Sequence, residues 1–170
     1  MRTKGIFGFT LIEMVIVVAI VALLAGILVP VAFNQVDDAE KARAMADVRQ
    51  ISSALLLFRQ DTGIWPTRSR LLYSDGNKAR QETQFESSGL QHMRNALREN
   101  TPATNGWKGP YMTSFPPDPW GNRYVIEARG FVDGADPLAW VISAGPDGTF
   151  QTGCNDKSLQ GDDIGIVMSN

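Results

Sequence analysis

The chain has 170 residues and a net charge of −2, which is enough length for one modest domain and one long additional element. The charge is unevenly distributed: residues 131–170 hold six aspartates and one lysine, and the rest of the chain carries a net charge of +3. A nucleic-acid-binding protein would instead show a clustered basic face, so this class is excluded. The acidic residues 131–170 are better suited to binding a cation.

Cysteine and histidine, which often take part in catalysis or metal binding, occur once each. Cys154 is the only cysteine, so an intrachain disulfide is excluded, and the thiol is buried, free or paired with another chain. His92 is the only histidine, which excludes zinc sites with several histidines. A Ser-His-Asp relay is excluded unless His92 serves it. We expect His92 to lie on the surface of a polar helix.

Residues 9–33 form an apolar segment whose single ionisable side chain is Glu13. About 20 apolar residues span a bilayer as a helix, and the preceding Arg2 and Lys4 place the N-terminus in the cytoplasm. An ordinary secretory signal peptide has a shorter apolar core. A plain single-pass anchor fits the length but leaves Glu13 unexplained, because a carboxylate inside an apolar span usually has a partner or a function.

The stretch Gly8-Phe9-Thr10-Leu11-Ile12-Glu13 resembles the processing site of type IV pilins and of the related pseudopilins of type II secretion. The resemblance implies that a prepilin peptidase cleaves between Gly8 and Phe9 and that Phe9 is then N-methylated. It also implies an assembly role for Glu13. Cleavage creates an α-amino group at Phe9, and Glu13 of a neighbouring subunit can pair with it, so that two costly charges compensate each other.

After residue 33 the pattern becomes amphipathic, and one helix from Phe9 to about Asp61 would be roughly 80 Å long. Pro30 removes a backbone donor and predicts a kink, and the resemblance implies local melting of the helix there in a filament. Gly63 is a stop signal. The expected apolar stripe comprises Val36, Ala39, Ala42, Ala46, Val48, Ile51, Leu55 and Phe58.

The rest of the chain predicts a connecting region with one short helix, followed by a sheet. The helix is expected at 87–99, with Leu90, Met93 and Leu97 on one side. Strands are expected at 123–127, 138–143 and 164–168, in an antiparallel sheet that packs on the long helix. The fold class is therefore α+β and pilin-like. The expected divisions are a leader (1–8), a transmembrane and filament-core helix (9–33), an amphipathic helix half (34–63), the connecting region (64–110) and the sheet region (111–170).

Two later stretches extend the resemblance to the major pseudopilins of type II secretion. Residues 106–111 with 117–124 resemble the region before the sheet of that family, and 143–148 with 161–164 are similar to its calcium loop. The resemblance selects its calcium ligands, whereas an EF-hand pattern is absent. Without the resemblance, Asp147 would be interpreted only as part of a turn, and Asp162 and Asp163 as a solvated pair of carboxylates. The selected residues are Ser143, Asp147, Asp162 and Asp163.

The leading hypothesis is a structural subunit of a type II secretion pseudopilus, without catalytic activity. The implied partners are further copies of the chain, minor pseudopilins, the inner-membrane secretion platform, the prepilin peptidase and the membrane itself. The implied location is the bacterial inner membrane, with a periplasmic C-terminal domain and a periplasmic filament after assembly. The alternatives are a type IV pilin for adhesion or motility, a single-pass binding or sensor protein, and a membrane-anchored periplasmic metal-dependent hydrolase. The hydrolase lacks support, because P-loop, HExxH and GxSxG motifs are absent.

Overall fold

The computed structural model describes residues 9–66, 71–81, 90–101, 103–127, 138–153 and 156–169, without the side chains of residues 29–34, 71, 90, 91, 127, 138 and 169. The chain forms two compact units, Met1–Ala39 and Glu40–Asn170. Helix α1 (Leu11–Thr62) supplies residues to both. The predicted long helix is therefore confirmed. It ends at Gly63, which has a φ of 74° and donates its N–H to the Arg59 carbonyl at 2.8 Å.

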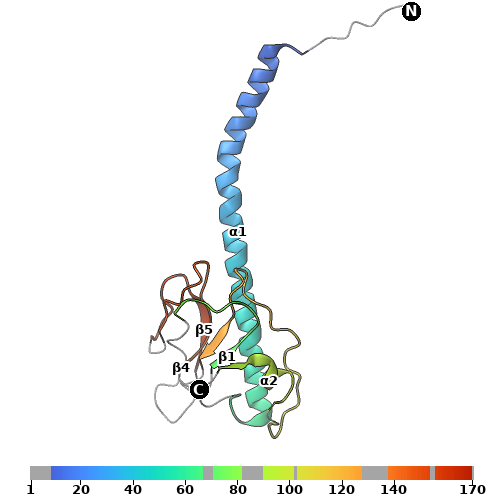
Figure 1. The fold of residues 1–170 in the computed structure, drawn as a ribbon, viewed down its shortest axis with the longest axis vertical. Coiled ribbons are helices and arrows are strands. Elements are labelled where there is room, and N and C mark those ends of the chain that lie inside the picture. Colours follow the sequence, from blue (N-terminus) through green and yellow to red (C-terminus); the bar gives the residue numbers. More distant parts are fainter. Residues whose placement is uncertain are drawn as a thin grey trace, which may run out of the picture. The chain divides into compact units, whose positions relative to one another are not determined.

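The second unit contains one five-stranded sheet, shown in Figure 1, in the order β2-β1-β3-β4-β5. The strands are β1 (Leu71–Tyr73), β2 (Leu90–His92), β3 (Val125–Glu127), β4 (Leu138–Ser143) and β5 (Ile164–Ser169). All neighbouring pairs are antiparallel except β1 and β2, which are parallel. The three predicted strands are confirmed as β3, β4 and β5. The two additional strands come from the region that was expected only to connect the helix to the sheet.

The predicted short helix is wrong in extent. Helix α2 comprises only Met93–Leu97, and the preceding Leu90 lies in β2. The helix begins after His92 because the His92 backbone is extended and its side chain accepts a hydrogen bond from the N–H of Arg94, as an N-cap residue does. Met93 and Leu97 are buried, as expected.

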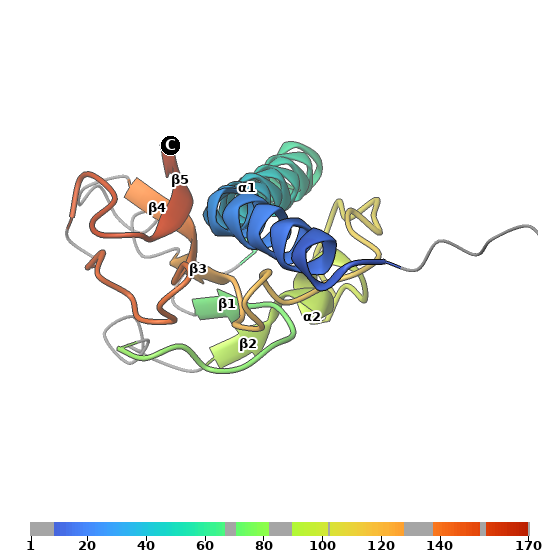
Figure 2. The same ribbon diagram turned by 90° about the horizontal axis from the view of Figure 1, so that it is seen from above.

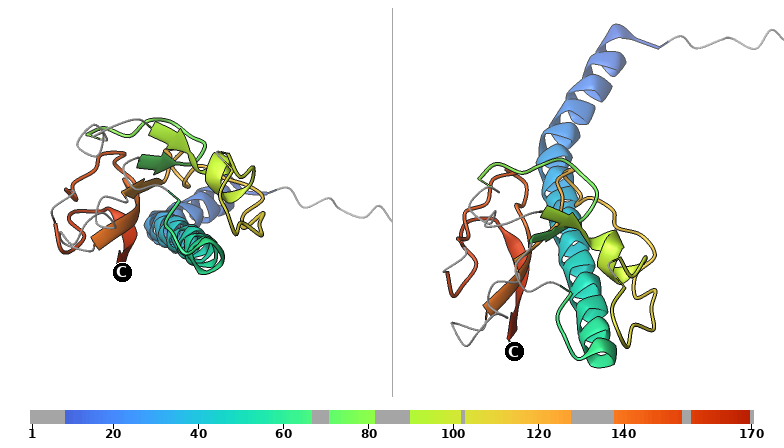
Figure 3. Two further views of the ribbon diagram at one scale, coloured as in Figure 1. Left: turned by 90° about the horizontal axis from the view of Figure 1, so that it is seen from below. Right: turned by 60° about the horizontal axis from the view of Figure 1, so that its bottom comes forward.

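The α1 segment of the second unit packs along one face of the sheet (Figures 1 and 3). Its buried stripe contacts apolar side chains of β1, β3, β4 and β5. The prediction was correct for Val48, Ile51, Leu55 and Phe58. It was wrong for Val36, Ala39, Ala42 and Ala46, which are exposed. Ala44 is buried instead, because it lies four residues before Val48, whereas Ala46 is about 200° around the helix from Val48.

A second core lies on the opposite face of the sheet. Successive side chains of a strand point to opposite faces, so Trp140 and Ile142 of β4 face away from α1. They pack with Val125, Ala144 and Phe150. Figure 2 shows the orange-red loop between β4 and β5 on this side of the sheet, away from α1. The loop that holds the predicted calcium ligands is thus anchored by its own apolar contacts.

Candidate functional sites

The start of α1 forms a reciprocal cap between Thr10 and Glu13. One carboxylate oxygen of Glu13 accepts hydrogen bonds from the Thr10 N–H at 2.7 Å and from the Thr10 hydroxyl at 2.8 Å. The N–H of Glu13 donates to the Thr10 hydroxyl at 3.3 Å. This arrangement is a capping box, and a carboxylate in the first turn also interacts favourably with the helix dipole. The spacing of threonine and glutamate could have predicted the cap, which the sequence interpretation missed.

The first turns of α1 expose their apolar side chains. The segment Leu11–Leu28 is long and apolar enough to cross a membrane, and none of it is buried within the chain. The exposed fractions of its large apolar side chains run from 52% at Ile16 to 82% at Leu11. A contiguous apolar surface of this size marks contact with lipid or with other protein chains.

The remaining predicted residues of this segment are only partly described. Phe9 is highly exposed. Gly8 lies outside the described residues, and so does the side chain of Pro30. The backbone at position 30 is helical, as part of the unbroken helix α1. The predicted melting at Pro30 concerns a filament and stays a prediction.

At the far end of the chain, Ser143 is bonded to a buried aspartate. Its hydroxyl donates to Asp118 at 2.6 Å and accepts from the N–H of Gly145 at 3.1 Å. The other carboxylate oxygen of Asp118 accepts from the N–H groups of Trp120 and Asn122. Burial raises the pKa of Asp118, and the bonds from Ser143, Trp120 and Asn122 act in the opposite direction. Ser143 thereby connects the turn at 118–122 to the start of the acidic loop.

Asp147 and Asp162 are brought together across this loop. Asp162 accepts a hydrogen bond from the N–H of Asp147 at 3.3 Å. Asp147 accepts from the Thr149 N–H at 2.7 Å and from the side-chain amide of Gln151 at 2.8 Å. The close approach requires Gly145, which has a φ of 65° and leaves no room for a Cβ beside the Asp162 carbonyl.

Asp163 is the most buried of the three predicted aspartate ligands, with 6% of its surface exposed. Its Oδ2 accepts from the N–H groups of Gln151 at 2.9 Å and Thr152 at 2.6 Å. Its Oδ1 is buried and accepts no hydrogen bond from the described residues, and the same is true of Gln151 Oε1. Burial raises the pKa of Asp163, and the neighbouring Asp162 adds to this effect.

The loop offers oxygen atoms of the kind that calcium binds, but its charged side chains are not gathered into a site for the ion. Within the described ranges, no three His, Cys, Asp or Glu side chains gather closely enough to hold a metal ion. Buried oxygens without a donor are nevertheless the groups that a hard cation would satisfy, because calcium takes carboxylate and amide oxygens.

Arg80 holds the acidic loop from the region whose role the sequence did not indicate. Its guanidinium donates to the Asp147 carbonyl at 2.8 Å, and its backbone N–H donates to the Gly148 carbonyl at 2.8 Å. The Phe150 N–H returns a bond to the Arg80 carbonyl at 3.1 Å. Only the folded chain brings these segments together, so no local sequence signal could have found the contact.

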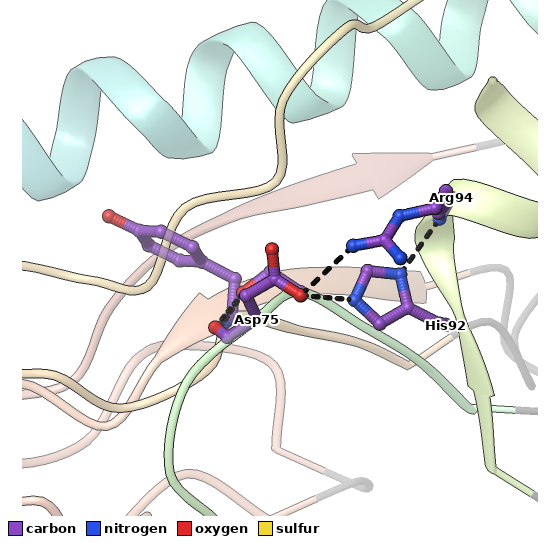
Figure 4. Close-up of polar contacts among 5 residues, drawn as sticks. Asp75, His92 and Arg94 are labelled. Atoms are coloured by element: carbon purple, nitrogen blue, oxygen red, sulfur yellow. Dashed lines mark hydrogen bonds and ion pairs between the residues drawn. The ribbon is translucent and has the colours of Figure 1, made fainter.

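His92 is not a surface residue on a polar helix, as had been expected. Its side chain is 19% exposed and donates through Nε2 to Asp75 Oδ1 at 2.9 Å (Figure 4). The donor assignment follows because Nδ1 accepts from the Arg94 N–H, and the Arg94 guanidinium also reaches Asp75 at 3.3 Å. Both ring nitrogens are thus occupied by structural bonds. The arrangement caps α2 and ties it to the turn after β1.

Two known families match parts of the sequence. Residues 4–29 match the prokaryotic N-terminal methylation motif, which covers Gly8, Phe9 and Glu13. Residues 83–161 match the family described as type II secretion system protein G, and this stretch includes Ser143 and Asp147. A search of the solved structures found no match.

Several curated proteins are similar over most of the chain, and each is named type II secretion system core protein G. The protein from Escherichia coli is 30% identical over 145 residues, which cover 85% of each chain. The protein from Pseudomonas aeruginosa is 29% identical over 94% of this chain and 96% of its own length. The protein from Vibrio cholerae is 28% identical over 83% of this chain and 81% of its own length.

Proposed function

Because the chain belongs to the family of type II secretion system core protein G, we propose that it polymerises into a periplasmic pseudopilus that drives protein export. The observation that carries the proposal is the helix Leu11–Leu28, whose apolar surface has no cover within the chain. Lipid covers this surface before assembly, and the same surface of other copies covers it in the filament. The chain itself performs no catalysis.

The proposed assembly begins with cleavage between Gly8 and Phe9 by a prepilin peptidase, followed by N-methylation of Phe9. The α-amino group of Phe9 is then available to Glu13 of the neighbouring subunit. In the single chain the Glu13 carboxylate is held by neutral donors of Thr10. Those donors satisfy its hydrogen bonds but leave its charge uncompensated, whereas the amino group supplies the opposite charge. This difference favours the assembled state.

Two substitutions separate the charge of Glu13 from its capping role. Glu13→Gln keeps an oxygen that can accept from Thr10 but removes the charge, so we expect processed, membrane-inserted chain that forms no filaments and does not support secretion. Thr10→Ala removes the hydroxyl bonds of the cap but keeps the charge, so filaments should form. The measurement is filament yield sheared from cells that overproduce the chain, together with the amount of chain in the membrane fraction. Normal filaments from Glu13→Gln would contradict the proposed pairing.

The proposed partners are further copies of the chain, minor pseudopilins and the inner-membrane secretion platform. The proposed location is the inner membrane, with the unit Glu40–Asn170 in the periplasm. A type IV pilin for adhesion or motility is the competing function, but such pilins usually carry a C-terminal disulfide loop, which the single Cys154 cannot form. Deletion of the gene should stop secretion and leave surface motility unchanged. Loss of motility with normal secretion would favour the pilin.

We also propose that the loop between β4 and β5 binds calcium through Asp147, Asp162 and Asp163. The support is that these three carboxylates lie in one loop and that the buried Asp163 Oδ1 accepts no hydrogen bond from the described residues. Ser143, selected earlier as a ligand, already bonds Asp118 and Gly145, so in this proposal it positions the loop. Chelation should lower the melting temperature of the full chain in detergent, and Asp147→Ala should remove this response. An unchanged melting temperature would contradict the proposal.

A further inference from the structure

Gln151 occupies a position in the acidic loop that the sequence interpretation did not single out. Its backbone N–H donates to Asp163 Oδ2 at 2.9 Å. Its side-chain Nε2 donates to Asp147 Oδ2 at 2.8 Å. Gln151 is therefore bonded to two of the three aspartates that are proposed as ligands. The donation to Asp147 also fixes which end of the amide is the nitrogen and which is the oxygen.

The amide oxygen of Gln151 is enclosed but has no donor. Gln151 Oε1 is buried and accepts no hydrogen bond from any described residue. Gly161 packs directly against it, since a Cβ at that position would lie 2.7 Å from Oε1. Asp163 Oδ1 is the second buried oxygen in this loop without a donor. Two such acceptors require something that attracts oxygen lone pairs, because a buried acceptor without a partner is destabilising.

A cation meets this requirement better than a hydrogen-bond donor of the chain. Arg80, the nearby guanidinium that contacts the loop, is directed to the main-chain carbonyl of Asp147 rather than to a carboxylate. Water molecules could donate to the free oxygens, but they would leave the negative charges of the three proposed aspartate ligands uncompensated. A bound divalent cation accepts oxygen lone pairs and also offsets these charges.

We infer that Gln151 is a direct calcium ligand through Oε1, while its Nε2 holds Asp147 in place. This inference rests on the calcium proposal above. In this inference one of the calcium ligands is the neutral amide of Gln151. The Gln151 side chain therefore has two separate roles, one at each end of its amide, and these roles can be tested independently.

The test is calorimetric titration of calcium into the metal-stripped, full-length chain in detergent. Gln151→Met removes the oxygen and the donor at similar length, and binding should weaken at least about tenfold, as the loss of groups around a metal typically does. Gln151→Glu keeps an oxygen at the ligand position but loses the donor to Asp147. It should bind within about tenfold of the unaltered chain, which is about 1.4 kcal/mol.

Gln160→Met is the matched control, because Gln160 is an exposed glutamine of the same loop whose amide donates only to Ser158. Its calcium affinity should be unchanged. Equal losses in Gln151→Met and Gln151→Glu would mean that the side chain acts only through Asp147, which overturns the ligand role. Unchanged binding in Gln151→Met would overturn it as well, with the calcium proposal intact. If the unaltered chain binds no calcium, a water site only is present and both proposals fail.

Gln151→Glu keeps the inference testable if Gln151→Met does not fold. In that case normal calcium affinity in Gln151→Glu supports the oxygen ligand, and lost affinity contradicts it. Near-ultraviolet circular dichroism of each variant in excess chelator reports whether the domain is folded before calcium is added.

Discussion

The two parts of helix α1 differ in what covers their apolar side chains. In Leu11–Leu28 every large apolar side chain is more than half exposed, and none is buried by the chain. In the part that belongs to the second unit, Val48, Ile51 and Leu55 are almost completely buried against the sheet. One continuous helix thus serves two environments, one supplied by its own domain and one that must come from outside the chain.

This difference shows that a helix can be predicted from the sequence although part of its apolar surface has no cover within the chain. Burial of apolar surface stabilises the second part without any partner. The first part would expose the same kind of surface to water and gains its stability only from lipid or from other subunits. Substitutions in the two parts should therefore change different properties, namely domain unfolding in one and membrane insertion or assembly in the other.

The largest expected effect is on the free energy of unfolding, and it should distinguish two adjacent leucines in the part of α1 that belongs to the second unit. Leu55 is 1% exposed and Leu56 is 52% exposed. Leu55→Ala should lower the free energy of unfolding by about 2–5 kcal/mol, because it leaves a cavity in the core. Leu56→Ala should change it by about 0.5 kcal/mol or less. Urea unfolding of the chain in detergent, followed by tryptophan fluorescence, measures both. Equal effects would contradict the assignment of the buried face.

The corresponding test of the first part is Val21→Asp, near the middle of the apolar segment. A carboxylate there should oppose membrane insertion by about 2.5–3.5 kcal/mol. The fraction of chain in the membrane should fall, while the urea midpoint of the second unit stays the same. Val21→Leu is the control and should leave both quantities unchanged. A shifted urea midpoint would mean that the two parts are not independent.

A smaller effect on the free energy of unfolding is expected at the hydrogen bond between Tyr124, next to β3, and α1. The buried Tyr124 donates its hydroxyl proton to Asp47 of α1 at 2.9 Å. Burial and the Asp47 carboxylate both raise the pKa of Tyr124, so the hydroxyl remains a donor across the physiological range. Tyr124→Phe should lower the free energy of unfolding by about 1.5–3 kcal/mol, as for a hydrogen bond to a charged group. Tyr73→Phe, in β1, is the comparison and should cost less.

The smallest effect should arise at His92, which caps α2 and bonds Asp75 away from α1. His92→Ala should lower the free energy of unfolding by about 1 kcal/mol, the usual cost of a lost N-cap. It should have no effect on membrane insertion. Arg98→Ala, at the exposed other end of α2, is the control. A loss of secretion in a stably folded His92→Ala chain would show a role beyond this capping.

Elements with a clear apolar pattern were predictable from the sequence, and elements without one were not. Helix α1 and strands β4 and β5 have enough apolar periodicity to be recognised, and the three-residue strand β3 lies within the predicted strand 123–127. Strands β1 and β2 also have three residues each, and β2 was absorbed into a predicted helix because Leu90, Met93 and Leu97 have helical spacing. The pairing with β1 and the His92 cap decided the outcome. The pairing depends on tertiary structure, whereas the cap is a local bond that the apolar spacing does not reveal.

The candidate sites follow the same division. Glu13 could be identified because its position relative to Gly8 and Phe9 is local in the sequence. Asp147, Asp162 and Asp163 were selected through resemblance. The contact of Arg80 with the loop could not be predicted, because it depends on how distant segments pack. The bond from Gln151 to Asp147 is local, but no sequence pattern indicated it.

The central claim is that residues 9–28 form a processed assembly segment rather than a plain anchor. The most direct test is the mass of the chain purified from membranes of cells that contain a prepilin peptidase. We predict that residues 1–8 are absent and that the new N-terminal Phe9 carries one methyl group. The same chain from cells without the peptidase should retain the leader. An intact Met1 at the N-terminus in both preparations would contradict the claim.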